Sequence, residues 1–253
     1  MILSITNQKG GVGKTTSAIN ISAGLALAGK KVLLLDLDPQ GNATSGLGIE
    51  KNNKGIYNVL VENESIQAVI MKTNINNLDI IPSNIELSGA TVEMVALKNR
   101  EHLLKNAIEE IKDRYDYIII DCPPSLDLLT VNAFTATDKV LVPIQCEYYA
   151  LEGLGQLMNT IMVIKKRLNP TLDIDGVVCT MYSTRTKLSE QVVQEVKKYF
   201  STKVYDTRIP RNVRLAEAPS FGEPIQIFDA YCPGALAYKE LCKEIIERNE
   251  ANK

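Results

Sequence analysis

Short apolar runs alternate with longer segments of helical periodicity along this chain. The apolar runs, rich in β-branched residues, are Ile2–Thr6, Val32–Leu37, Leu78–Ile81, Tyr117–Ile120, Val140–Pro143, Ile174–Cys179 and Val204–Asp206. Because successive positions within each run are apolar, both faces of these strands are expected to be buried. This pattern is typical of parallel strands that are covered by helices on both sides.

The segments between the apolar runs repeat with the period of a helix. The predicted helices are Thr15–Ala28, Leu103–Lys112, Leu151–Leu168, Glu190–Phe200 and Leu236–Arg248. Gly29 is placed to end the first helix in the left-handed conformation, and Ser189 is placed to cap the fourth. The alternation predicts a doubly wound α/β fold, with a mostly parallel sheet and helices on both faces. With no repeat or linker in the sequence, residues 1–253 are expected to form a single domain, with Glu50–Lys54 as a surface loop.

Composition excludes several classes of protein. The 253 residues are 45% hydrophobic and 23% charged, which excludes a disordered or fibrous chain, and the net charge of -2 excludes a uniformly basic nucleic-acid coat. The five cysteines form no C-x-x-C pair, so free thiols in a reducing compartment are expected. His102 is the single histidine and is expected to be structural, which excludes sites that need two histidines. No signal peptide or membrane-spanning run is visible, and a cytoplasmic protein is predicted.

The strongest chemical signal is the segment K-G-G-V-G-K-T-T, which lies between a predicted strand and a predicted helix. Glycines allow backbone N–H groups to surround an anion, and the helix N-terminus adds partial positive charge. Lys14 is then placed to reach the β- and γ-phosphates, and the Thr15 hydroxyl to bind Mg²⁺. Although Gln8 replaces the first glycine of the common pattern, and a ligand-free turn is the alternative, the sequence predicts a nucleotide site. Its residues are Lys9, Gly10, Gly11, Val12, Gly13, Lys14, Thr15 and Thr16.

Acidic residues follow two of the predicted strands. Asp36 and Asp38 come at the end of the strand Val32–Leu37, where ligands bind in open α/β sheets. Asp38 is a candidate to orient or deprotonate a water molecule, and Asp36 to support a metal shell, while a simple strand-end turn is the alternative for Asp38. Asp121 ends another apolar strand and is predicted to hold Mg²⁺.

The K-G-G-V-G-K-T-T loop, with the early lysine Lys9, resembles that of the deviant Walker A ATPases. This group includes ParA/Soj partition proteins, MinD, the nitrogenase iron protein and the arsenite pump ATPase. The segments D-L-D-P-Q-G-N and I-P-R-N-V-R-L-A-E-A-P-S are similar to those of ParA/Soj proteins, and the resemblance extends from Gln8 to Ser220. It implies that Lys9 crosses a dimer interface to the partner's nucleotide and acts with Lys14 and Asp38 in catalysis. A solvated loop lysine is the alternative for Lys9.

The same resemblance assigns two further segments. It implies that the backbone around Pro210 and Asn212 packs against adenine. It also implies that E-x-x-A-x-x-G, which begins at Glu147, lies near the dimer face, for which a structural role is equally compatible. The nitrogenase iron protein raises the alternative of an iron–sulfur site on Cys122 and Cys146, but the residues around them do not match its cluster segments.

Positive charge is concentrated between Thr180 and Leu215. This segment has eight basic and three acidic residues, although the whole chain is weakly acidic. Such a stripe predicts sequence-independent, salt-sensitive binding to the phosphate backbone of DNA, with a solvated face as the alternative. The resemblance carries the DNA contacts onto Arg185 and Arg214, although Ser183, Thr184 and Lys187 depart from the common D-x-R-T-x-L pattern.

Together these features resemble a Soj/ParA-type partitioning ATPase that uses ATP and Mg²⁺. The resemblance implies an ATP-dependent homodimer that binds nucleoid DNA non-specifically and releases it after hydrolysis. It also implies slow turnover that a ParB-type partner stimulates, and effects on replication initiation or sporulation in some relatives. One alternative is a MinD-like membrane-positioning ATPase, but the helix Leu236–Arg248 lacks a basic amphipathic face. Another is a ligase similar to dethiobiotin synthetase, for which no polar substrate cluster is visible.

Overall fold

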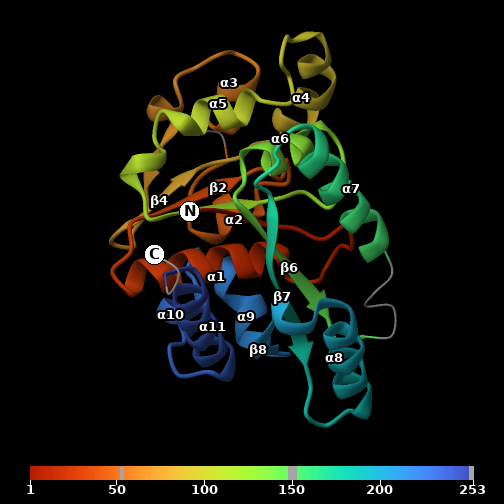
Figure 1. Cartoon of the computed structure of the whole chain (residues 1–253). Coiled ribbons are helices and arrows are strands. Elements are labelled where there is room, and N and C mark those ends of the chain that lie inside the picture. Colours follow the sequence, from red (N-terminus) through yellow and green to blue (C-terminus); the bar gives the residue numbers. More distant parts are fainter. Residues whose placement is uncertain (52–53, 148–152, 251–253) are drawn as a thin grey trace.

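A single mostly parallel sheet organises the protein (Figure 1). The computed structural model describes residues 1–51, 54–147 and 153–250. Within them the strands are β1 (Ile2–Ile5), β2 (Val32–Asp36), β3 (Met71–Lys72), β4 (Leu78–Ile81), β5 (Tyr117–Asp121), β6 (Lys139–Gln145), β7 (Asp173–Tyr182) and β8 (Val204–Pro210). Their order is β3-β4-β2-β5-β1-β6-β7-β8, and β3 alone among these strands runs antiparallel to its neighbour.

Helices cover both faces of this sheet. Figure 1 shows α1, α10 and α11 on one side and α3, α5 and α6 on the other. The helices are α1 (Lys14–Leu27), α2 (Asn42–Gly46), α3 (Ile56–Leu60), α4 (Leu87–Glu93), α5 (Leu103–Glu109), α6 (Leu128–Ala136), α7 (Leu154–Arg167), α8 (Lys187–Phe200), α9 (Val213–Glu217), α10 (Ile225–Phe228) and α11 (Pro233–Glu250). Short 3-10 turns occupy Ile66–Val69, Met94–Ala96, Lys112–Arg114, Ser201–Lys203 and Ala218–Phe221.

Two hydrophobic clusters sandwich the sheet, because successive side chains of a strand point to opposite faces. Leu33 and Leu35 of β2 belong to one cluster, and Val32 and Leu34 belong to the other. All four side chains are fully buried. The predicted doubly wound α/β fold, with helices on both faces, is therefore confirmed.

The predicted strands are all present, but several local details differ from the sequence analysis. Helices α2, α3, α4, α6 and α10 were not among the predicted helices. Strand β8 continues to Pro210, so the start of the I-P-R-N segment is a strand rather than a loop. The two-residue edge strand β3 was not predicted, because so short a run has no detectable alternation. The helix at Leu103 ends at Glu109, three residues early. Gly29, at φ +87°, ends α1 in the left-handed conformation as expected.

The prediction that Ser189 caps a helix is wrong. Helix α8 begins at Lys187, with Thr186 at the capping position, and Ser189 lies buried inside its first turn. The Ser189 hydroxyl interacts with the Thr186 hydroxyl at 2.9 Å and accepts a hydrogen bond from the backbone N–H of Ser183 at 3.3 Å. Its role is therefore to close the turn between β7 and α8. Parts of the predicted loop Glu50–Lys54 and helix Leu151–Leu168 lie outside the described residues.

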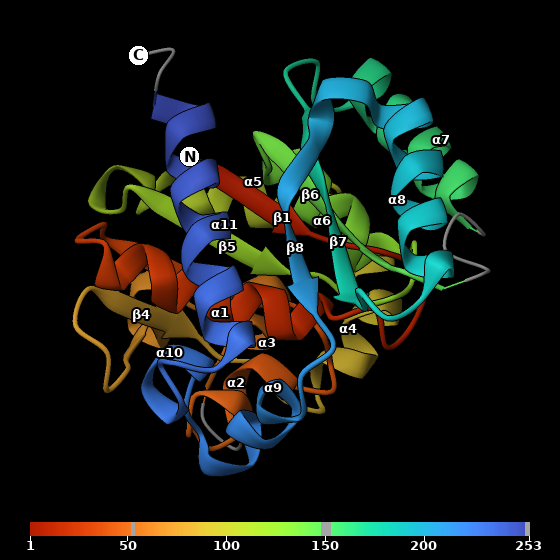
Figure 2. The same ribbon diagram turned by 90° about the horizontal axis from the view of Figure 1, so that it is seen from below.

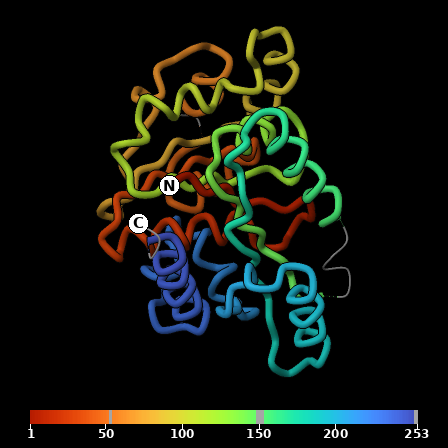
Figure 3. The backbone as a smooth tube through the Cα atoms, viewed as in Figure 1, coloured from red at the N-terminus to blue at the C-terminus, as the bar shows by residue number. Residues whose placement is uncertain are grey.

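The C-terminal part of the chain returns to the start of the molecule. Figure 3 shows the segment after β8, in blue, running beside α1, in red. Helix α11 packs against both α1 and β8. Seen from below in Figure 2, α9 and α10 lie at the same end of the molecule as α2. This return places residues near 210 beside the loop that precedes α1.

Candidate functional site

The loop between β1 and α1 leaves space and backbone N–H groups for an anion. Gly11 and Gly13 adopt left-handed backbone angles, with φ of +73° and +89°. A Cβ atom added at Gly10 or Gly11 would meet no heavy atom of the described residues within 4 Å. No side chain caps α1, so its first backbone N–H groups are available to an anion.

Two neighbouring elements hold this loop in place. The Asn7 side chain accepts a hydrogen bond from the backbone N–H of Lys9 at 3.0 Å and donates to the carbonyl of Pro143 at 2.8 Å. The Thr180 hydroxyl, at the end of β7, donates to the carbonyl of Val12 at 2.8 Å. The loop is therefore fixed to β6 and β7 before any ligand binds.

Lys14 lies inside the curve of the loop. Its side-chain ammonium donates a hydrogen bond to the carbonyl of Lys9 at 3.1 Å, and the residue is only 8% exposed. Burial lowers the pKa of Lys14, while the nearby carboxylates of Asp121 and Asp38 oppose that shift. The result is a desolvated cation at the place where the loop would hold phosphate oxygens.

Asp121 is a buried carboxylate whose charge is poorly compensated by its surroundings. Within the described residues neither of its oxygen atoms makes a hydrogen bond, and the side chain is fully buried. Burial raises its pKa well above the usual range, the Asp36 charge adds to that rise, and the Thr15 hydroxyl opposes it. An orphaned carboxylate is costly unless a cation joins it, so Asp121 and Thr15 fit a Mg²⁺ ion that keeps most of its other ligands as water and phosphate oxygens.

Asp36 and Asp38 lie at the same sheet edge but have different surroundings. Asp36 is fully buried beside Asp121, its register partner on β5, and burial raises its pKa to about 6. Its carboxylate accepts hydrogen bonds from the backbone N–H and hydroxyl of Thr44 at 2.8 and 2.7 Å. Asp38 is 9% exposed and accepts one from the backbone N–H of Gln40 at 2.9 Å. Asp36 thus stabilises the edge from inside, and Asp38 lies nearer the solvent.

A separate cavity of about 310 Å³ opens beside the loop. Its lining is mostly apolar and includes Gly13, Thr16, Met181, Pro210, Asn212 and Tyr238. The side-chain oxygen of Asn212 is buried and has no partner among the described residues. A flat heterocycle with a hydrogen-bond donor at its edge would fit such a cavity.

Tyr238 is a residue of this cavity that the sequence analysis missed. It is buried on α11, and its hydroxyl interacts with that of Ser17 on α1 at 3.0 Å. The motifs end at Ser220, so no local sequence signal marked Tyr238 as a site residue. Only the packing of α11 against α1 brings it there.

Ion pairs neutralise much of the basic stripe between Thr180 and Leu215. Arg208 pairs with Glu190 at 2.7 Å and Arg211 with Glu147 at 2.9 Å. Three lysines have acidic partners as well: Lys197 with Asp206, Lys198 with Glu195 and Lys203 with Asp173. Over the described ranges, Arg185 and Lys187 are exposed and form no ion pair. The exposed positive charge is therefore centred on the turn before α8.

Arg214 is held more firmly than a solvated arginine. Its guanidinium pairs with Glu217 at 2.8 Å and with Asp229 at 2.9 Å, and it lies 4.4 Å from the ring centre of Phe228. Arg214 therefore joins α9 to α10, and a phosphate group would have to compete with two carboxylates for it.

The remaining sequence candidates give little support for other chemistry. A metal cage of three or more His, Cys, Asp or Glu side chains is absent from the part of the chain that the structure describes. Cys122 and Cys146 are buried free thiols there, like the other three cysteines. Glu147 pairs with Arg211, whereas positions 148–152 of the E-x-x-A-x-x-G segment lie outside the described residues.

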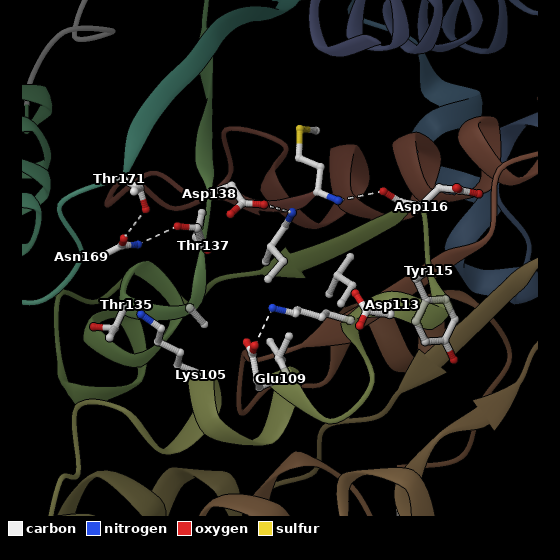
Figure 4. Close-up of a pocket in the computed structure, with 16 residues that line it drawn as sticks. Lys105, Glu109, Asp113, Tyr115, Asp116, Thr135, Thr137, Asp138, Asn169 and Thr171 are labelled. Atoms are coloured by element: carbon white, nitrogen blue, oxygen red, sulfur yellow. Dashed lines mark hydrogen bonds and ion pairs between the residues drawn. The ribbon is translucent and has the colours of Figure 1, made fainter. Parts of the chain in front are cut away.

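A polar cavity of about 550 Å³ lies at the opposite, amino-terminal edge of the sheet (Figure 4). Its polar groups bond to one another: the backbone N–H of Ile2 donates to Asp138 at 2.7 Å, and Lys112 pairs with Glu109 at 2.5 Å. The Asn169 side chain donates to the carbonyl of Thr137 at 2.7 Å. The bonds of Ile2 and Asn169 tie together the segments at the starts of β1, β6 and β7, so we place the functional site at the other edge.

Comparisons with known proteins agree with this geometry. Residues 1–174 match the family model described as an AAA domain. The chain is 57% identical over 246 residues to the sporulation initiation inhibitor protein Soj of Bacillus subtilis, which covers 96% of this chain and 97% of that protein. It is 53% identical to the chromosome-partitioning ATPase Soj of Treponema pallidum, over 98% and 97% of the two chains.

Solved structures share the fold over nearly the whole chain. Cobyrinic acid a,c-diamide synthase from Mycobacterium smegmatis, with bound ADP and magnesium, has a TM-score of 0.88 at 34% identity and covers 100% of this chain and 96% of its own. A plasmid partition protein from Borrelia burgdorferi bound to AMPPNP has a TM-score of 0.81 at 30% identity, with 97% of each chain covered. Because one fold serves different activities, the sequence relatives decide the family. By its site and by its relatives, the chain belongs to the ParA/Soj family of chromosome-partitioning ATPases.

Proposed function

We propose that this protein is an ATP-driven DNA-partitioning switch, in which the chain 1–253 acts as one ATPase domain. The observation that carries the proposal is the meeting, at one sheet edge, of the glycine loop, the buried Lys14 ammonium and the unpartnered Asp121 carboxylate. ADP with magnesium and AMPPNP in the two solved structures support the same ligand class for this chain.

ATP is held at three places in this proposal. The backbone N–H groups of residues 9–16 and the Lys14 ammonium bind the phosphates. Thr15 and Asp121 bind Mg²⁺, which when present neutralises phosphate charge. Pro210 and Asn212 line the apolar cavity for adenine, and the buried Asn212 oxygen suits the exocyclic amine of the base.

Hydrolysis then needs a water molecule in line with the γ-phosphorus. Asp38 orients that water from the partly open edge beside the loop. The water oxygen bonds to the γ-phosphorus, and the bond from that phosphorus to the bridging oxygen breaks. ADP leaves with the bridging oxygen, and both protons of the water leave with the phosphate, as H2PO4⁻. Turnover is slow in the protein alone, and a ParB-type partner accelerates it.

Two copies close around their nucleotides in this scheme. Lys9 is half-buried, and its backbone carbonyl accepts a hydrogen bond from the Lys14 ammonium. From that position its side chain reaches the phosphates bound by a second subunit. A cation from each subunit offsets the negative charge only when both are present, which makes dimerisation depend on ATP.

DNA binding is assigned to Arg185 and Arg214, which the dimer presents twice. Arg185 is exposed and has no acidic partner in the described segments, so it is ready for a phosphate contact. Phosphate contacts alone give binding without sequence preference, as expected of a protein that associates with the nucleoid in the cytoplasm.

Retention on DNA with different nucleotides tests this function. The purified protein is passed over immobilised non-specific duplex DNA with a non-hydrolysable ATP analogue, with ADP or without nucleotide. We expect retention with the ATP analogue only, and a steep loss between ~50 and ~200 mM salt. Equal retention in all three states would contradict an ATP-controlled switch.

Anionic lipid vesicles in the same assay test the MinD-like alternative. The described residues include no helix with the length and apolar character to cross a bilayer. ATP-dependent capture by vesicles instead of DNA would favour that alternative.

A further inference from the structure

Asp38 and three residues near it form a closed ring of hydrogen bonds. The backbone N–H and hydroxyl of Thr44 donate to one carboxylate oxygen of Asp36, and the N–H of Ser83 donates to the Thr44 hydroxyl at 2.9 Å. The Ser83 hydroxyl donates to the backbone carbonyl of Asp38 at 2.7 Å. The N–H of Asp38 completes the ring by donating to the other Asp36 oxygen at 3.2 Å.

This ring is shielded from water and joins separate elements. Asp36 and Thr44 are fully buried, and Ser83 is 1% exposed. Ser83 follows β4 and is 45 residues from Asp38 in the sequence, whereas Asp36 ends β2 and Thr44 lies on α2. Hydrogen bonds inside a protein, without competing water, hold groups more rigidly than the same bonds at the surface.

The turn after Asp38 packs tightly against Ser83. The N–H of Gly41 also donates to the Asp38 carbonyl, at 2.8 Å, and Gly41 has a φ of +60°. A Cβ atom at Gly41 would come within 3.1 Å of the Ser83 carbonyl oxygen. The Asp38 carbonyl group is therefore held by two hydrogen bonds, one from the Ser83 hydroxyl and one from the Gly41 N–H.

We propose that Ser83 and Thr44 are positioning residues for ATP hydrolysis, because they fix the backbone from which the Asp38 carboxylate projects. The proposal rests on the proposed function, in which Asp38 orients the attacking water. A displacement of about 1 Å in such a group costs a large part of the rate, even when the substrate still binds. Neither Ser83 nor Thr44 lines the adenine cavity or belongs to the phosphate loop. Their loss should therefore reduce turnover without weakening nucleotide binding.

Ser83→Ala tests this separation, because it removes the bond to the Asp38 carbonyl and keeps the N–H that bonds to Thr44. We expect the single-turnover rate of ATP hydrolysis to fall roughly tenfold, while the affinity for a fluorescent ATP analogue changes by less than about twofold. Amide hydrogen exchange at residues 38–44 should become faster. Thr135→Val is the control, since it removes another buried hydroxyl, which bonds to the Val131 carbonyl within α6 beside the cavity at the amino-terminal ends of the strands.

A second pair of variants covers the case in which Ser83→Ala does not fold. Thr44→Val keeps the shape of the side chain but removes its hydroxyl, and should lower the rate to a similar extent. Thr44→Ser restores the hydroxyl and should restore the rate. An unchanged rate of ATP hydrolysis in Ser83→Ala or in Thr44→Val would overturn the proposal. So would a loss of affinity for the ATP analogue as large as the loss of rate.

Asp38→Ala separates this proposal from the proposed function. If Asp38→Ala hydrolyses ATP at the normal rate, the assignment of the water-orienting group fails, and the ring has no catalytic role. If Asp38→Ala is inactive but Ser83→Ala and Thr44→Val are normal, only the positioning role fails.

Discussion

At the scale of single residues, the site brings together buried charges that the nucleotide-free protein stabilises poorly. Asp36 and Asp121 are fully buried neighbours across β2 and β5, and burial raises the pKa of both. Lys14 is the nearby cation, and burial lowers its pKa. A site with these features favours a ligand that brings both positive and negative charge, as Mg²⁺ with ATP does.

The first prediction concerns the stability cost of Asp121. Because its pKa is higher in the folded than in the unfolded protein, folding takes up a proton, and the free energy of unfolding falls as the pH rises through the interval between the two pKa values. Asp121→Asn takes up no proton. We expect the nucleotide-free variant to be more stable than the parent by at least about 1 kcal/mol at pH 7.5, with little difference near pH 4, in urea unfolding.

Asp113→Asn provides the matched control for this experiment. Asp113 is exposed, and its replacement by Asn removes the same formal charge as Asp121→Asn. The free energy of unfolding of Asp113→Asn should therefore equal that of the parent at each pH. Adding Mg²⁺ and an ATP analogue should stabilise the parent more than Asp121→Asn. A variant that is less stable than the parent at neutral pH would show that Asp121 has a partner that stabilises it in the absence of ligand.

At the scale of secondary-structure elements, the turn from β7 into α8 connects the two proposed activities. Thr180 near the end of β7 bonds to the phosphate loop, and Met181 lines the cavity proposed for adenine. Arg185 follows within the same turn and is exposed. A short segment thus runs from the proposed nucleotide site to the surface where the positive charge of Arg185 has no ion pair in the described residues.

The second prediction is that Arg185→Glu abolishes ATP-dependent retention on DNA and leaves ATP hydrolysis without DNA unchanged. Reversal of one phosphate-contacting charge in each subunit should also reduce the salt slope of any remaining binding. Lys105→Glu, an exposed position in the cavity of Figure 4, makes the same charge change at the other edge of the sheet. Loss of DNA binding in both variants would indicate a general charge effect rather than a contact at Arg185.

Arg214 is less suited to charge reversal. A glutamate there would meet Glu217 and Asp229, so a loss of DNA binding could come from disruption of α9 and α10. Arg185 gives the cleaner test because no ion pair in the described residues depends on it.

At the scale of the whole molecule, the parallel sheet sorts the chemistry to one edge. The carboxyl ends of β1, β2 and β5 carry the phosphate loop, Asp36 and Asp121, whereas the polar groups at the amino ends of β1 and β6 bond to one another. A dimer that forms through nucleotide must therefore join two such carboxyl edges, each with its own loop.

The third prediction is that Lys9→Ala binds nucleotide as a monomer. Its own phosphates remain held by Lys14 and the loop, so the affinity for an ATP analogue should change by less than about threefold. The nucleotide of each subunit no longer receives the Lys9 ammonium of the other subunit. The molar mass from light scattering with the ATP analogue should therefore stay that of one chain. Lys31→Ala, an exposed lysine before β2, should dimerise like the parent. A dimeric Lys9→Ala would exclude the contact across the interface.

The sequence by itself determined the parallel α/β class, the phosphate loop and the family, because these depend on local signals. Apolar runs define strands, and glycine spacing with Lys14 defines an anion site. The sequence analysis misplaced the N-cap of α8, because Ser189 and Thr186 both suit that position and only packing chooses between them.

Only the tertiary structure decided which distant residues meet. The packing of α11 against α1 brings Tyr238 to the cavity proposed for adenine, and the place of β4 beside β2 brings Ser83 to Asp38. Acidic partners such as Asp229 neutralise arginines that the sequence shows as free charge. The physical reason is that burial, ion pairing and hydrogen bonds between remote segments depend on how the layers pack, which no short stretch of sequence encodes.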